Sequence, residues 1–185
     1  MTTAYMKSRD CQCKKKCPTK KLEKDIRLAC GTRGGEVDLL NRTGDTINLV
    51  SVGIELGDLI TPLVKVDFAT TVEFEVTTSS PGSADTPDLE LQFILSRVCE
   101  DGIVQELETY TFIRDFNIVA AGSTLVARTT DPIGFTFCDC VTSCKTGCCT
   151  YSVQVFVSNV DVVPVSIATI DDSFINAIAQ GVKIC

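Results

Sequence analysis

The sequence predicts an all-β fold, a jelly-roll-like β-sandwich, on the basis of three observations. Apolar and polar residues alternate with a period of two along several stretches, as in strands with one buried face. Segments rich in Gly, Pro, Asp and Ser separate these stretches, as turns do. No stretch has a convincing helical pattern. About eight to ten short strands joined by turns are typical of a sandwich or a jelly roll.

The alternation is clearest between residues 64 and 76, where the large apolar residues share one parity. These residues are Val64, Val66, Phe68, Val72, Phe74 and Val76. Other strands are expected at 89–95, 110–112, 133–137 and 151–157, and near 36–42, 46–54, 119–128 and 160–170. Only for residues 172–180 do we expect one or two helical turns.

Composition narrows the function. A chain of 185 residues that is 44% hydrophobic fits one domain with its own core. No apolar run reaches about 18 residues, so we expect no membrane insertion. The chain has no histidine, which excludes Ser–His and Cys–His nucleophile pairs. This removes the commonest hydrolase designs but leaves carboxylate and Cys-only chemistry open. We expect no catalytic residues, no enzymatic activity, no metal and no cofactor.

Charge divides the chain into a basic connector arm, residues 1–25, and a β-sandwich domain, residues 26–185. Residues 1–27 carry a net charge of +6, and the remainder carries −13. The arm is expected to dock on the acidic body of a neighbouring copy, to be a solvated tail, or to bind nucleic acid. Tyr5 is its one aromatic residue, so it lacks stacking side chains, and we expect no nucleic-acid partner.

Eleven cysteines favour an oxidising destination, and their odd number leaves at least one for another chain or for a free thiol. No apolar segment typical of a signal peptide follows Met1. Three explanations of cysteines without a signal peptide remain open. The sequence could be a processed form, the cysteines could bind metal in a cytosol, or the protein could be made in a cell that later lyses, as a sporulating mother cell does.

Parity assigns the cysteines to faces. Cys30, Cys99 and Cys149 share the parity of neighbouring apolar residues, so we expect them to face the core as candidates for intramolecular disulfides. Cys138, Cys140 and Cys148 have the opposite parity and are expected to point outward. Residues 137–149 are expected to form a hairpin, in which Cys138 or Cys140 could bridge to Cys144 or Cys148. The same sulfurs could instead form an all-thiolate zinc site, although the spacing fits poorly.

The arm has almost no apolar residues to fold around, so its three cysteines are expected to crosslink to other chains. Cys185 is a further point for such a link. The candidates for intermolecular disulfides are therefore Cys11, Cys13, Cys17, Cys138, Cys140, Cys144, Cys148 and Cys185.

Four cysteine-bearing segments resemble a cysteine-rich domain of unknown function found in spore-forming clostridia. They are Leu28–Gly31, Leu95–Cys99, Phe135–Cys140 and Cys148–Val153, and the resemblance covers about residues 26–170. In design, a small jelly roll with a cysteine-bearing arm also resembles the endospore-appendage fibre subunits of bacilli. That resemblance implies a spore-surface protein formed in the mother cell and exposed when that cell lyses.

We therefore expect a structural subunit that assembles head to tail into a disulfide-crosslinked extracellular fibre on the spore surface. Its partners would be copies of itself in a helical homopolymer, together with proteins that anchor the fibre to the spore. The alternative is a binding module, either adhesin-like or a zinc-stabilised adaptor. Bound zinc in a reduced monomer would favour that alternative.

Overall fold

The computed structural model describes residues 22–78, 84–85, 88–115, 118–119, 125–141, 147–161 and 165–184. The regular structure within these ranges is entirely β. The strands are β1 (Leu22–Arg33), β2 (Val37–Asp38), β3 (Thr46–Glu55), β4 (Leu59–Thr78), β5 (Ala84–Asp85), β6 (Asp88–Cys99), β7 (Val104–Asp115), β8 (Ile118–Val119), β9 (Leu125–Cys140), β10 (Cys148–Val160) and β11 (Val165–Ile184).

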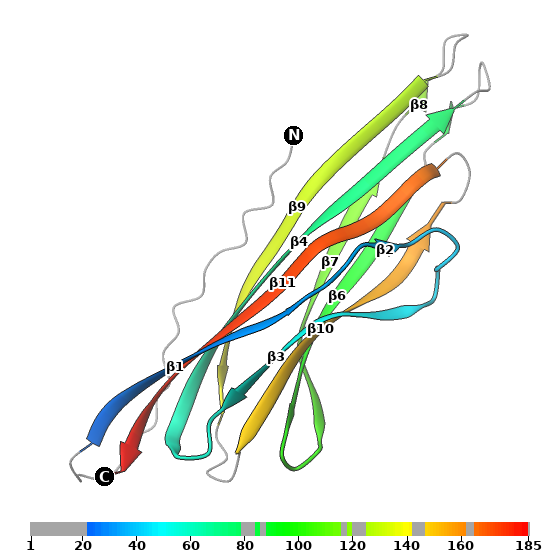
Figure 1. Ribbon diagram of the computed structural model, residues 1–185. Helices are drawn as coiled ribbons and strands as arrows, with labels where there is room; N and C mark the ends of the chain where they lie inside the picture. The colour runs from blue at the N-terminus through cyan, green and yellow to red at the C-terminus, as the bar shows by residue number, and fades with distance from the viewer. Residues whose placement is uncertain are drawn as a thin grey trace.

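Eight long strands form the two layers of a sandwich (Figure 1). Sheet A has the strand order β1-β11-β4-β9, and β2 pairs with the far part of β11. Sheet B has the order β3-β10-β6-β7, and β5 and β8 form a separate small ribbon. All the pairings are antiparallel.

The pairing of the eight long strands is nested. The first pairs with the last, β1 with β11, and inside that pair β3 pairs with β10, β4 with β9 and β6 with β7. These pairs alternate between the two sheets. Folding a nested set of antiparallel pairs into two sheets gives the jelly roll, so the predicted fold class is confirmed.

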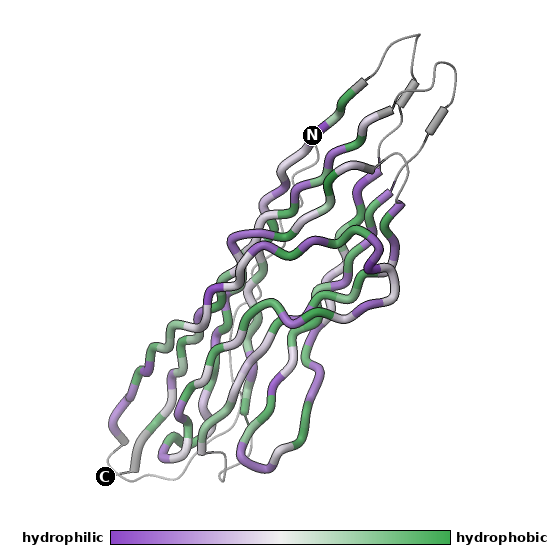
Figure 2. The backbone as a smooth tube through the Cα atoms, turned by 45° about the vertical axis from the view of Figure 1, so that its right-hand side comes forward, coloured by the Kyte–Doolittle hydropathy of each residue, from purple (hydrophilic) through white to green (hydrophobic). Residues whose placement is uncertain are grey.

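The core lies between the sheets and follows the alternation seen in the sequence. The six large apolar residues from Val64 to Val76 are all buried, as are Leu89, Leu91, Phe93 and Leu95 on β6 and Tyr151, Val153, Val155 and Val157 on β10. Figure 2 shows hydrophobic and hydrophilic segments alternating along the long strands. The period-2 pattern therefore identified the inner face correctly.

The helical turns expected at residues 172–180 are wrong, because this segment belongs to β11. Several of its inward positions carry small side chains, among them Ala177 and Ala179, whereas large apolar side chains such as Phe174 and Ile178 point outward and are exposed. Because β11 has apolar residues on both faces, its sequence does not show the alternation of apolar and polar residues that identifies a strand with a polar outer face.

The parity expected for β1 is also wrong. Ile26, Leu28 and Cys30 point outward, and Leu28 is 74% exposed. Gly31 faces inward, where an added Cβ would lie 2.4 Å from Cγ2 of Ile175 and 2.6 Å from the carbonyl oxygen of Ser51. Because β1 passes this close to β11 and β3 at Gly31, a side chain larger than that of glycine would clash there.

Two further boundaries differ from the sequence-based expectations. β1 begins at Leu22, before the boundary expected at residue 26. The strand expected near 36–42 is reduced to Val37–Asp38.

The two flanks of the sandwich differ. On one flank β1 is joined to β3, because the Ser51 amide donates to the Thr32 hydroxyl and Arg27 donates to the carbonyl oxygen of Glu55. On the other flank, β7 and β9 end their sheets, and within the described ranges no strand pairs with their outer edges. Side chains fill this flank, where the rings of Tyr110 and Phe135 stack with centroids 4.0 Å apart.

Candidate functional site

Cys99 and Cys149 form a disulfide within sheet B. They are directly opposed on β6 and β10, with Cα atoms 4.0 Å apart, and both are buried. The predicted core-facing orientation of these two cysteines is confirmed. The bridge closes a loop with a sequence separation of 50, which stabilises the fold by about 4 kcal/mol in the chain-entropy model.

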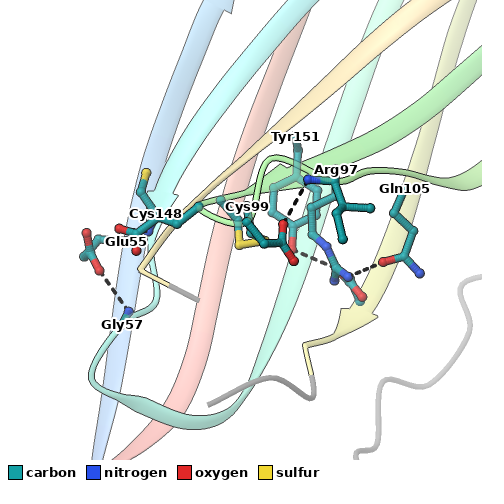
Figure 3. The surroundings of a disulfide bond; sticks show 12 residues. Glu55, Gly57, Arg97, Cys99, Gln105, Cys148 and Tyr151 are labelled. Atoms are coloured by element: carbon teal, nitrogen blue, oxygen red, sulfur yellow. Dashed lines mark hydrogen bonds and ion pairs between the residues drawn. A yellow bond between two sulfur atoms is a disulfide. The ribbon is translucent and has the colours of Figure 1, made fainter. Parts of the chain in front are cut away.

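A buried polar network beside this disulfide connects the two sheets (Figure 3). Asp139 points inward from β9 of sheet A, where its carboxylate accepts a 2.8 Å hydrogen bond from the Tyr151 hydroxyl of sheet B. The same carboxylate is paired with Arg97 on β6, which also donates to Gln105. Burial and the Asp139 charge raise the pKa of Tyr151 well above its usual range, so the phenol stays protonated and donates.

The hairpin expected over residues 137–149 is wrong. β9 pairs with β4 in sheet A, and β10 lies in sheet B, so Cys138 and Cys140 are not opposite Cys148. Both cysteines lie on the outer face of sheet A, as their parity predicted, and each takes part in a disulfide. Neither is therefore a free thiol in this structure. Cys144 lies outside the described residues.

Cys148, at the start of β10, is exposed and free, which agrees with its predicted outward orientation. Two carboxylates lie close to its backbone. Glu55 is its directly opposed residue on β3, and Glu100 accepts a hydrogen bond from the Cys148 amide at 3.3 Å. Glu55 is held by the amide of Gly57 at 2.9 Å. Figure 3 shows the Cys148 sulfur pointing away from the Cys99–Cys149 disulfide.

Cys30, on the outer face of sheet A, is the other free and exposed cysteine of the described ranges. The expectation that it faces the core and joins an intramolecular disulfide is wrong. Its directly opposed residue is Asn176, and the flanking positions of β11 carry the exposed Phe174 and Ile178. Leu28 lies two residues away on the same face, so this thiol stands among apolar side chains.

The remaining predicted cysteines, Cys11, Cys13, Cys17 and Cys185, lie outside the described residues. Within the described ranges, no three Cys, Asp or Glu side chains gather in a way that could hold a metal ion. No helix in these ranges is long and apolar enough to cross a membrane.

Sequence reasoning missed the carboxylates around Cys148 and the network around Asp139. Glu100 follows the disulfide cysteine directly in the sequence and was a detectable signal. Glu55 approaches Cys148 only through the β3–β10 register, and Asp139 meets Arg97 only across the two sheets. No local pattern contains either contact.

Residues 26–180 match the model of a protein family described as Domain of unknown function (DUF4489). This chain belongs to that family. The match confirms the expected domain of unknown function over this part of the chain. A comparison with curated proteins found no match.

Several solved structures are similar at low identity. A chain of the infectious bursal disease virus Gx strain is 16% identical with a TM-score of 0.45, and the alignment covers 86% of this chain and 32% of that one. A VP2 subviral particle of the same virus gives 13% identity and a TM-score of 0.27, with coverages of 91% and 43%.

The xylan-binding CBM22-1 domain of Xyn10C from Paenibacillus barcinonensis gives 13% identity and a TM-score of 0.16, covering 74% of this chain and 97% of that one. The chain spans about a third of the length of the Gx-strain chain. With TM-scores below 0.5, these likenesses carry no argument about what the protein does.

Proposed function

We propose that the protein is a structural subunit that assembles head to tail into a disulfide-crosslinked fibre or appendage outside the cell, on a spore surface. The observation that carries this proposal is the contrast among its cysteines. Cys99 and Cys149 are buried and bonded to each other, whereas Cys30 and Cys148 are exposed and unbonded on opposite outer faces. Thiols placed this way are suited to links between molecules.

Exposed apolar side chains support association. Ile26, Leu28, Phe174 and Ile178 lie together on β1 and β11, and they are between 37% and 74% exposed. Clustered apolar side chains on an outer sheet face are typical of contact surfaces between proteins. The patch surrounds Cys30, so a non-covalent contact and a covalent link would share one surface.

The open flank offers a second kind of contact. The outer edge of β7 carries backbone amides and carbonyls to which a strand from a neighbour could add. The β9 edge is less suited, because Pro132 has no amide hydrogen to donate. Contacts between two different surfaces do not close into a dimer, and they generate rings or helical filaments.

In this proposal the partners are copies of the same chain, with spore-surface proteins as anchors, and the protein has no catalytic role. Assembly in a mother cell that later lyses would place the fibre outside the cell. Extracellular exposure would keep its disulfides oxidised.

The test is electrophoresis of the full chain after oxidation, boiled in detergent with and without reductant. We expect a ladder of high-mass species that collapses to 20.0 kDa only when a thiol is added. A 20.0 kDa band in both lanes would overturn the proposal. Zinc measured in that monomer would then favour a metal-stabilised adaptor.

A further inference from the structure

We propose that the surface around Cys148 is the docking site for the basic, cysteine-bearing arm of a second copy, and that Cys148 is the thiol to which an arm cysteine is linked. We define this Cys148 surface by Cys148, Glu55, Glu100, Ile103 and Val104. The inference rests on the proposed function, because it names the contact by which one subunit is joined to the next.

Charge complementarity identifies the occupant. Glu55 is directly opposed to Cys148 on β3, and Glu100, in the turn after β6, accepts a hydrogen bond from the Cys148 amide. The Glu55 side chain is held by the Gly57 amide, so both carboxylates are fixed close to Cys148. Arg27, which donates to the Glu55 carbonyl oxygen, is itself paired with Asp25 and Asp58, so the surroundings keep an excess of negative charge.

The arm supplies the opposite charge next to its cysteines. Lys14, Lys15 and Lys16 stand between Cys13 and Cys17, within an arm of net positive charge. A lysine run beside a cysteine would bring its ammonium groups to Glu55 and Glu100 as the two sulfurs approach. Such steering raises the rate of encounter at low ionic strength.

Exposed apolar side chains follow Glu100 closely in the chain. Ile103 precedes β7 and Val104 is its first residue, and they are 67% and 69% accessible. Cys30 provides the contrast within the same molecule. Its neighbours Asn176, Phe174 and Ile178 are uncharged, so nothing there selects a basic segment.

The chemistry is the oxidation of two thiols to one disulfide. Cys148 and the arm cysteine together lose two protons and two electrons. A small-molecule disulfide accepts them by thiol–disulfide exchange, through a mixed disulfide on one of the two sulfurs, and leaves as two thiols.

Isotope mixing tests the proposal directly. Full-length chains labelled with ¹⁴N and ¹⁵N are reduced, mixed in equal amounts and oxidised with oxidised glutathione, then digested at acidic pH without reductant. Mass spectrometry should find Cys148 peptides linked to arm peptides that contain Cys11, Cys13 or Cys17, including pairs of one light and one heavy chain. The proposal fails if Cys148 stays reduced in the polymer, if it links only to Cys148 or Cys30, or if every pair carries a single isotope.

Matched variants separate this proposal from the proposed function. Cys148→Ser should abolish arm-to-body dimers, and Cys30→Ser should leave them. Polymer that forms equally well with Cys148→Ser would overturn the docking site but not the fibre. No crosslinked species from the unaltered chain would overturn the fibre itself.

Charge variants test the steering. Glu55→Gln and Glu100→Gln keep the hydrogen-bond acceptors but remove the charge, so each should slow dimer formation roughly two- to fivefold at low salt. Glu36→Gln removes the same charge from an exposed position outside the Cys148 surface and should leave the rate unchanged. High salt should remove the differences among the three variants, because it screens exposed charges. Equal rates at low salt would contradict the charge argument.

Discussion

The cysteines inside the sandwich and those on its outer faces differ in their bonding. Inside, the two cysteines are bonded to each other, and Asp139 satisfies both Arg97 and Tyr151. Outside, Cys30 and Cys148 are exposed and unbonded. These inner groups therefore stabilise the fold, whereas the thiols of Cys30 and Cys148 remain available to a partner. Cys138 and Cys140, on the outer face of sheet A, are already in disulfides.

The strongest test of this difference removes two cysteines from each location. Replacing Cys99 and Cys149 by Ala should lower the free energy of unfolding by about 4 kcal/mol, because the loop constraint on the unfolded chain is lost. Replacing Cys30 and Cys148 by Ala should change it by less than about 0.5 kcal/mol. Urea denaturation of the two double variants measures both values, and similar losses would remove the distinction.

The next test breaks the network between the sheets. Asp139→Ala removes the acceptor of the buried Tyr151 hydroxyl and the charged partner of the largely buried Arg97, so we expect a loss of about 3 kcal/mol. Gln105→Ala removes only the partner of Arg97 on the exposed side and should cost less than about 1 kcal/mol. If the two variants melt together, Asp139 does not connect the sheets energetically.

A third comparison uses one residue type on two faces. Leu91 is fully buried and Leu28 is 74% exposed. Leu91→Ala should destabilise the fold by about 3 kcal/mol, because it leaves a cavity. Leu28→Ala should alter stability by less than about 0.5 kcal/mol and weaken association instead. Denaturation and sedimentation of the same samples separate the two effects, and a large loss of stability from Leu28→Ala would show that β1 packs inward.

The smallest effect concerns pH. Burial and the neighbouring Asp161 carboxylate raise the pKa of Asp88 above its usual value. A raised folded-state pKa favours the protonated fold, so this contribution is present below the unfolded pKa of about 3.9 and is lost as pH rises through the folded value. Asp88→Asn should therefore add a few tenths of a kcal/mol at neutral pH, about what an exposed charge pair contributes. It should add nothing in acid, and an equal gain at both pH values in thermal denaturation would contradict this account.

The jelly roll was predictable because most inner strands alternate cleanly, and Val64 to Val76 on β4 and Tyr151 to Val157 on β10 needed only a period of two. β1 and β11 were harder to predict. Their outer faces carry Leu28, Phe174 and Ile178, and the inward small residues are dictated by a close approach between strands distant in sequence. The parity of Cys30 was misassigned for the same reason.

The site was only partly predictable. Outward Cys148 and core-facing Cys99 and Cys149 followed from local parity. The surroundings of Cys148 did not, because Glu55 reaches it through a pairing of residues far apart in the chain. The connection between β9 and β10 crosses from sheet A to sheet B, but its sequence is also compatible with a hairpin turn within one sheet.

The nested pairing of the strands also sets the order in which the domain can form. β1 has no partner in sheet A until β11 has been synthesised. At the end of the β1–β11 pairing, Leu22 is opposite Ile184. A chain leaving the ribosome can therefore complete the inner hairpin of β6 and β7 early, but the outermost pair of the nest must wait for the last strand. With so many contacts between distant residues, closure is expected to be slow, on the scale of milliseconds to seconds, and to follow synthesis of the domain.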